Sequence, residues 1–222
     1  MIARRRVLSA AIAAAIAWGA PGRAADAGAG EAPEKREALE GPKLDALLAD
    51  VAKARRGVKT LRATFTQERR IRLLATSVKS RGELTFGAGE RLRWDLAPPD
   101  DVVYFVGPEG LSYKTRSSTA TVPARGANVA RALVDLRALL TGDLAALRDR
   151  YTLSASRGAR DVEVSGIAKD KAASVKSFSL LLDRALVVPI RSRLIEGKDD
   201  SVDLVFSNVV VDGPVDPTRL RP

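Results

Sequence analysis

The residue types that most often carry enzyme chemistry are absent from this sequence or poorly placed. The chain contains no histidine and no cysteine, so it lacks the usual general base and the commonest metal ligands. Two pairs of adjacent acids, at 100–101 and 199–200, lie in turn-like sequence, where carboxylates are ordinarily solvated. The sequence has no Gly-x-Ser-x-Gly elbow and no phosphate-binding glycine loop. We therefore expect a protein that is not an enzyme and that uses no cofactor or metal.

The strongest pattern is instead an alternation of apolar and polar residues over 61–113. Leu84 and Phe86 share one face of a predicted strand, and Leu92 and Trp94 share one face of the next. Because their neighbours are polar, this period of two predicts antiparallel strands with one wet face and one apolar face. The apolar face covers either a filled core or a cavity for an acyl chain or an apolar peptide. On composition alone, a filled core is the simpler interpretation.

The remaining periodicity indicates one α+β domain. Helical spacing of leucines predicts helices over 42–57 and 128–141, the second followed by a short turn through 148. Strands are predicted over 61–67, 77–86, 91–97, 102–106, 111–116, 151–156, 161–167, 175–183, 186–195 and 201–211. Short strands joined by turns favour an antiparallel sheet curled on itself, with the helices on its concave face. Residues 213–222 are expected to form a tail or a final edge segment.

The N-terminal residues are typical of an exported protein. Three arginines at 4–6 precede an Ala-rich apolar stretch and small residues near Ala24. We predict a signal peptide over 1–24, a flexible leader over 25–42 and a single domain over 43–222; a retained membrane anchor and twin-arginine export are the alternatives. Removing the signal lowers the net charge from +10 to +6, because that segment holds four arginines and no acid. The charges are mixed along the chain without interleaved aromatics, so we expect no nucleic-acid partner.

Several short phrases together resemble the LolA family of periplasmic lipoprotein carriers. Residues 63–67 contain its Phe-x-Gln strand, and 82–86 followed by 92–94 resemble its Gly-x-Leu and aromatic-x-Trp strands. The double proline followed by a hairpin, over 98–110, is similar to its proline turn. Phe-x-Asn-Val at 206–209 matches the family near its end. The order and spacing of the phrases make the resemblance more specific than any one of them.

The resemblance implies an incomplete antiparallel β-barrel, a strongly curved sheet whose hydrophobic cavity is lidded by helices. It implies a monomeric periplasmic carrier, or lipoprotein-transport chaperone, that binds the acyl chains of lipoproteins or a related lipid and ferries them from the inner to the outer membrane. Its expected partners are the acylated cargo, an inner-membrane ABC transporter and an outer-membrane acceptor. An alternative with the same fold is a sensor or adaptor that binds a lipidated or unfolded envelope protein and regulates without transporting.

The resemblance and strand parity also indicate which residues face the cavity. Leu92 and Trp94 match family positions at the cavity mouth, and parity turns three other strand residues inward. The second predicted helix supplies the lid. The predicted lipid-cavity residues are Phe65, Leu84, Phe86, Leu92, Trp94, Leu133, Leu136 and Leu140. The alternative, that these residues are plain core packing, stays open.

One departure from the family concerns the lid. Family members commonly end the strand before Leu-x-Trp with Arg-Pro, and that arginine is thought to latch the lid, whereas this chain has Ala88 and Gly89 there. Arg91 and Arg93 are nearby, but both are predicted to face outward. The sequence therefore does not predict the family latch, and a cargo other than a lipoprotein stays an alternative.

Overall fold

The computed structural model describes residues 35–72, 76–87, 89–108, 110–116, 119–122, 128–197 and 200–222. Its elements are β1 (Glu37–Leu39), α1 (Gly41–Gly57), β2 (Leu61–Arg70), β3 (Ser77–Gly87), β4 (Arg91–Leu96), β5 (Val102–Gly107), β6 (Gly110–Lys114), β7 (Thr119–Val122), α2 (Asn128–Thr141), α3 (Leu144–Arg150), β8 (Tyr151–Arg157), β9 (Asp161–Ala168), β10 (Val175–Asp183), β11 (Pro189–Glu196), β12 (Asp200–Val211) and the 3₁₀ turn η1 (Pro217–Leu220).

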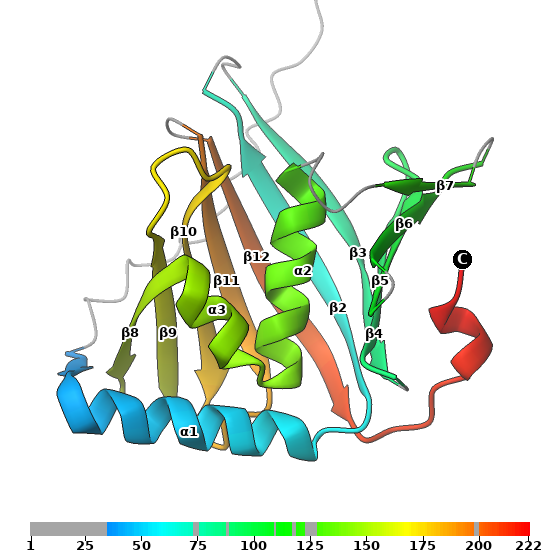
Figure 1. Ribbon diagram of the computed structural model, residues 1–222. Coiled ribbons are helices and arrows are strands. Elements are labelled where there is room, and N and C mark those ends of the chain that lie inside the picture. The colour runs from blue at the N-terminus through cyan, green and yellow to red at the C-terminus, as the bar shows by residue number, and fades with distance from the viewer. Residues whose placement is uncertain are drawn as a thin grey trace, which may run out of the picture. The chain divides into compact units, whose positions relative to one another are not determined.

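Within the described residues, the strands form one twelve-stranded sheet in the order β1-β8-β9-β10-β11-β12-β2-β3-β4-β5-β6-β7. Every neighbouring pair is antiparallel. The sheet bends so strongly that the β8–β11 wall and the β3–β6 wall face each other across its concave side (Figure 1). Strands β1 and β7 stand at the two ends of this order and do not pair with each other in the part of the chain described, so the barrel is open. The α+β fold class predicted from the sequence is confirmed.

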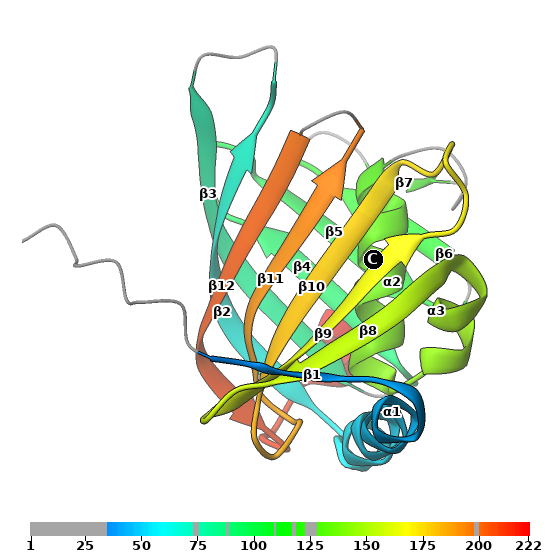
Figure 2. The same ribbon diagram turned by 90° about the vertical axis from the view of Figure 1, so that its left-hand side faces the viewer.

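The helices lie on the concave side and across one end of the barrel. In Figure 1, α2 stands between the two walls and α1 crosses below them; Figure 2 shows α2 and α3 behind the β8–β12 wall. Leu133, Leu136 and Leu140 of α2 join the core cluster of β2–β6, whereas Ala138 and Leu139 join the cluster of β8–β10. The lid helix is therefore held by both walls, and its two apolar faces explain its unusually wide leucine stripe.

A glycine ends α2 and sets the position of the lid against α1. Gly142 has a φ of +75°, a backbone conformation that side chains with a Cβ rarely adopt, and a Cβ there would lie 2.7 Å from the Ala52 carbonyl oxygen. Asp143 follows as the N-cap of α3, where its carboxylate accepts from the Ala146 N–H at 3.2 Å. The tight corner brings α1, α2 and α3 into direct contact.

The core below the lid is built around one aromatic pair. The rings of Phe65 and Trp94 stack with centroids 3.9 Å apart, and Phe206 meets both of them edge-on. Gly82 pairs with Phe65 across β2 and β3, and a Cβ at Gly82 would lie 1.9 Å from the Asp95 carbonyl oxygen and 2.6 Å from the Phe65 ring. The glycine of the Gly-x-Leu phrase in β3 therefore leaves the space in which Phe65 reaches Trp94.

Three segments differ from the sequence-based expectation. Residues 37–39, expected in a flexible leader, form β1 on β8, and Leu39 is buried. Residues 119–122 form β7, which the sequence did not predict. The C-terminal segment ends in η1, which packs on β3 and β4 with Leu220 only 1% exposed. Each segment gains its order from contacts with other elements of the sheet. The predicted signal peptide lies outside the described residues.

Candidate functional site

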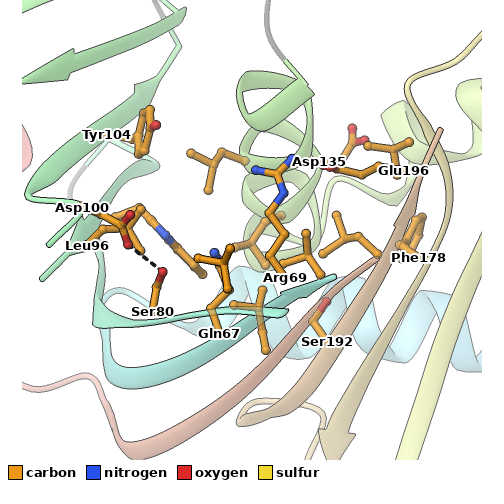
Figure 3. Close-up of a pocket in the computed structure, with 18 of the residues that line it drawn as sticks. Gln67, Arg69, Ser80, Leu96, Asp100, Tyr104, Asp135, Phe178, Ser192 and Glu196 are labelled. Atoms are coloured by element: carbon orange, nitrogen blue, oxygen red, sulfur yellow. Dashed lines mark hydrogen bonds and ion pairs between the residues drawn. The ribbon is translucent and has the colours of Figure 1, made fainter. Parts of the chain in front are cut away.

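A cavity of about 360 Å³ lies between the concave face of the sheet and helix α2 (Figure 3). One wall comes from β2–β5, the other from β10–β12, and α2 closes the space between them. The lining residues are Gln67, Arg69, Ile71, Val78, Ser80, Trp94, Leu96, Asp100, Val102, Tyr104, Leu133, Asp135, Leu136, Leu139, Val175, Phe178, Ser192, Leu194, Glu196, Val202 and Leu204. Most are apolar, which suits a ligand with a hydrocarbon part.

The inner face of β2 shows where the core ends and the cavity begins. Leu61, Ala63 and Phe65 are buried in the core, but the next two residues of the same parity, Gln67 and Arg69, line the cavity. Because alternate residues of a strand point to one face, this switch follows directly from the sequence of β2. The cavity is therefore apolar at the Trp94 end and carries polar groups toward the end of β2.

The central polar group is an arginine that reaches along the cavity wall. The Arg69 guanidinium pairs with the Glu196 carboxylate of β11 at 2.8 Å, over the intervening strand β12. Glu196 is nearly fully buried, whereas the Arg69 side chain is about one-third exposed. Arg69 Nε is itself buried and has no hydrogen-bond partner among the described residues. A buried N–H without an acceptor is unfavourable, so a ligand oxygen placed there would be stabilised.

A second polar cluster fastens the lid helix to the start of β8. Asp135 of α2 accepts a hydrogen bond from the Tyr151 hydroxyl at 2.6 Å and forms an ion pair with Arg150 at 2.6 Å. Asp135 is only 4% exposed, so two partners are needed to compensate the desolvation of its charge. The cluster holds the middle of α2 in place beside the cavity.

The β2–β5 wall also carries a hydroxyl and a carboxylate farther from β12. The Ser80 hydroxyl donates to the Asp100 carboxylate at 2.6 Å, and Tyr104 lies beside them (Figure 3). Burial, and then the negative charge of Asp100, raise the pKa of Tyr104, although Arg69 opposes the shift. The Tyr104 hydroxyl therefore stays protonated at neutral pH and is a hydrogen-bond donor.

Two arginines outside the cavity hold the C-terminal half of the lid helix. Arg137 of α2 donates from Nε to the Glu90 carbonyl oxygen and from its terminal nitrogen to the Glu90 carboxylate, both at 2.7 Å. Arg55 of α1 donates to the carbonyl oxygen of Leu140 at 3.3 Å and to that of Val187. Burial lowers the pKa of Arg55 to about 10, so the group is still charged at neutral pH.

The eight residues predicted to face the cavity all lie in one buried cluster on the concave side. Trp94, Leu133 and Leu136 line the cavity. The other members, Phe65, Leu84, Phe86, Leu92 and Leu140, lie in the packed core beneath it. Their contact with a ligand stays a prediction.

Arg93, one of the two arginines near this corner, has its partners on the sheet and on η1. Arg93 pairs with Asp95 on the same strand at 2.7 Å, lies 5.2 Å over the Phe105 ring and donates to the Arg219 carbonyl oxygen of η1. Gly89 has a φ of +70° at the β3–β4 corner, and Ala88 lies outside the described residues. Arg137 of α2 links this corner to the lid helix, because it donates to Glu90.

Three acids of the turn pairs act as acceptors, and Asp199 lies outside the described residues. Asp100 bonds Ser80, Asp101 pairs with Arg116, and Asp200 accepts from the Arg72 N–H at 2.8 Å. In the part of the chain that the structure describes, no group of three or more His, Cys, Asp or Glu side chains could hold a metal ion. Nor does any described helix have the length and apolar character needed to cross a membrane.

Sequence reasoning missed the polar side of the cavity. Gln67 and Arg69 continue the inward parity of Phe65, and this signal was present in the sequence. Asp135 interrupts the leucine stripe of α2, which is a second local signal. For Glu196 the sequence held no local signal, because its proximity to Arg69 depends on the strand order β11-β12-β2.

An open, curved antiparallel sheet with helices over a concave cavity defines the fold class of the lipoprotein carriers. The family model "Outer membrane lipoprotein carrier protein LolA" matches residues 56–220, and the chain belongs to this family. Comparison with curated protein sequences finds no match.

Solved structures with the same architecture differ widely in sequence. An uncharacterized conserved protein from Thermus thermophilus is 10% identical to this chain, with a TM-score of 0.51. The match covers 80% of this chain and 93% of the Thermus protein. The LolA superfamily protein NE2245 from Nitrosomonas europaea is 8% identical, with a TM-score of 0.45 and coverages of 81% and 97%. A putative outer membrane lipoprotein-sorting protein domain from Vibrio parahaemolyticus is 13% identical, with a TM-score of 0.45 and coverages of 78% and 94%.

Proposed function

We propose that this protein is a periplasmic carrier that binds the acyl chains of lipoproteins, or of a related lipid, in the cavity beneath α2. It takes the cargo from the inner membrane and delivers it to the outer membrane. The observation that carries the proposal is the cavity itself, which lies under a helical lid in a member of the lipoprotein carrier family. Catalysis has no part in this proposal.

The energetics of transfer set what such a cavity must supply. Removing an acyl chain from a membrane forfeits about 0.8 kcal/mol for each buried CH₂, so a long chain has roughly 10 kcal/mol at stake. Leu133, Leu136 and Leu139 of the lid and Phe178, Leu194 and Leu204 of the sheet offer replacement apolar surface. Because the lid also packs on both walls, closing it competes with cargo and favours release.

The size of the cavity limits the cargo in this arrangement. A volume of about 360 Å³ is at the lower end of ligand sites, which span roughly 300–1,000 Å³. The closed arrangement therefore suits a single acyl chain, and additional chains require α2 to move away from one wall. The contacts of Arg137 and Asp135 are among those that such a movement would break.

The proposal includes partners and a compartment. We propose an inner-membrane ABC transporter as the donor, an outer-membrane receptor as the acceptor, a monomeric carrier and export through the signal peptide predicted over 1–24. The family match supports a role in the bacterial envelope.

Release of a labelled lipoprotein from inner-membrane vesicles that contain its transporter tests the proposal. The protein should bring the lipoprotein into solution as a complex, and Leu133→Glu, which puts a charge on the cavity wall, should abolish release. Val205→Glu on the exposed outer face of β12 is the matched control and should behave as the native chain. Equal release with Leu133→Glu, in a variant that is folded by circular dichroism, would contradict the proposal. Stable binding without transfer to acceptor membranes would favour the sensor or adaptor.

A further inference from the structure

The charges that line the cavity are unequal in number. Arg69 is the one cation among the lining residues, whereas Asp100, Asp135 and Glu196 are three carboxylates. Arg150 pairs with Asp135 from outside the lining and offsets one of them. With Arg150 included, two cations face three carboxylates, so the polar part of the cavity carries a net negative charge within the described residues. An anion that enters it would meet carboxylates on both walls and on the lid.

Arg69, the cation that could attract an anion, is already paired with a carboxylate. Arg69 pairs with Glu196 at 2.8 Å, and Glu196 is nearly fully buried on the neighbouring β10–β12 wall. A carboxylate or phosphate placed on this guanidinium would come close to Glu196, and two negative charges in a poorly solvated site repel each other. The ion pair therefore opposes a second anion.

The hydrogen-bonding groups left over suit a neutral polar group. Arg69 Nε is buried without an acceptor among the described residues, and a carbonyl oxygen would satisfy it. The Gln67 amide is a further donor, because this residue lines the cavity from the same face of β2 as Arg69. Tyr104 adds a protonated hydroxyl from β5 of the same wall. These donors match ester and amide carbonyls, which accept hydrogen bonds without bringing a charge.

We infer that the cavity selects acyl chains joined to a neutral head group through an ester or amide carbonyl, and discriminates against amphiphiles with an anionic head. This inference rests on the proposed function, since it requires that the cavity bind acyl chains. It gives the Arg69–Glu196 pair a role in choosing the ligand. Such a carrier would leave fatty-acid carboxylates and phosphate-headed lipids behind in a membrane and take acylated groups of neutral linkage.

Three ligands with the same twelve-carbon chain test the inference: dodecanoate, 1-dodecanoylglycerol and dodecanoyl amide. Binding to the full chain is measured by isothermal titration calorimetry at pH 8, where the carboxylate is ionised, and below the micelle concentration of each ligand. We expect both neutral ligands to bind the native protein roughly tenfold or more tightly than dodecanoate, from charge repulsion in a partly buried site.

Glu196→Gln frees the Arg69 cation and should shift the ratio toward dodecanoate by roughly tenfold. Because that variant leaves Arg69 unpaired, the double variant Arg69→Gln with Glu196→Gln is measured beside it and should bind the three ligands with a reduced preference. Glu68→Gln is the matched control, because Glu68 lies on the outer face of β2 and pairs with Arg70 at 3.3 Å. It should keep the native ratio.

Equal affinities for the three ligands, or tighter binding of dodecanoate, by the native protein would overturn the inference and leave the proposed function standing. An unchanged ratio in Glu196→Gln and in the double variant would also overturn it. Failure of the folded native protein to bind any of the three ligands would overturn the proposed function as well.

Discussion

Arg137 on the lid helix binds Glu90 at the β3–β4 corner twice, through the backbone carbonyl oxygen and the carboxylate, each at 2.7 Å. The cation is on the helix and both acceptors are on the corner, so this contact links the lid helix to the sheet.

Replacing Arg137 should loosen the lid without unfolding the protein. Glu90 is 61% exposed, and exposed ion pairs contribute only about 0–1 kcal/mol to stability. We expect Arg137→Gln to change the melting temperature little and to speed dissociation of a fluorescent acyl ligand severalfold, measured by stopped-flow displacement.

Glu90→Gln is the matched comparison for the latch, because it keeps the backbone acceptor of Arg137. Its effect on ligand dissociation should be smaller than that of Arg137→Gln. Dissociation rates that are identical in the native chain and in Arg137→Gln would show that this contact does not restrain the lid.

Arg55 should matter for stability rather than for ligand exchange. It is 1% exposed and satisfies the carbonyl oxygens of Leu140 and Val187, so Arg55→Met leaves both without this donor. We expect a loss of about 1–3 kcal/mol in the free energy of unfolding by urea, in line with the cost of unsatisfied buried groups. The neighbouring Arg56, which is exposed, provides the control Arg56→Met, whose stability should equal that of the native chain.

The pH dependence of the Arg55 effect follows from its lowered pKa. The folded pKa of about 10 lies below that of an arginine in the unfolded chain, so above pH 10 the unfolded state binds more protons and this group favours folding increasingly as pH rises. Between pH 6 and 9 both states are charged. The penalty of Arg55→Met should therefore be the same at pH 6 and pH 9, and a penalty that changed across this range would contradict the assigned pKa.

Gly82 should tolerate no side chain. A Cβ there would approach the Asp95 carbonyl oxygen and the Phe65 ring at distances no real contact reaches, so β3 or the aromatic pair must shift. We expect Gly82→Ala to lower the free energy of unfolding by about 1–3 kcal/mol, as overpacking does. Gly57→Ala, where no atom lies within 4 Å of the new Cβ, should be neutral or slightly stabilising. Similar stabilities of the two variants would contradict the packing described for Phe65.

Local pattern predicted most of the fold, because each long strand and helix has its own periodicity. The predicted second helix, 128–141, coincides with α2, and the alternation in β2–β4 placed their apolar residues on the concave face. Strands β1 and β7 were missed because three or four residues carry too little pattern. Their order comes from pairing with β8 and β6.

The candidate site was harder to predict than the fold. Strand parity orients Phe65 and Trp94 inward, but it does not say where packing ends and a cavity begins. That boundary depends on how far α2 reaches along the concave face. The Arg69–Glu196 pair joins residues 127 positions apart and exists only because β12 lies between β2 and β11. Such contacts follow from topology and not from local sequence.

The most direct test of the account asks whether an acyl chain lies beneath α2. A photoreactive residue in place of Leu136, on the cavity wall, is compared with one in place of Val205, on the exposed outer face, after loading with a lipoprotein that carries radiolabelled acyl chains. The account predicts that irradiation links the labelled chain to position 136 and not to position 205. Labelling at 205 equal to that at 136, or none at 136 in a protein that still binds the lipoprotein, would contradict it.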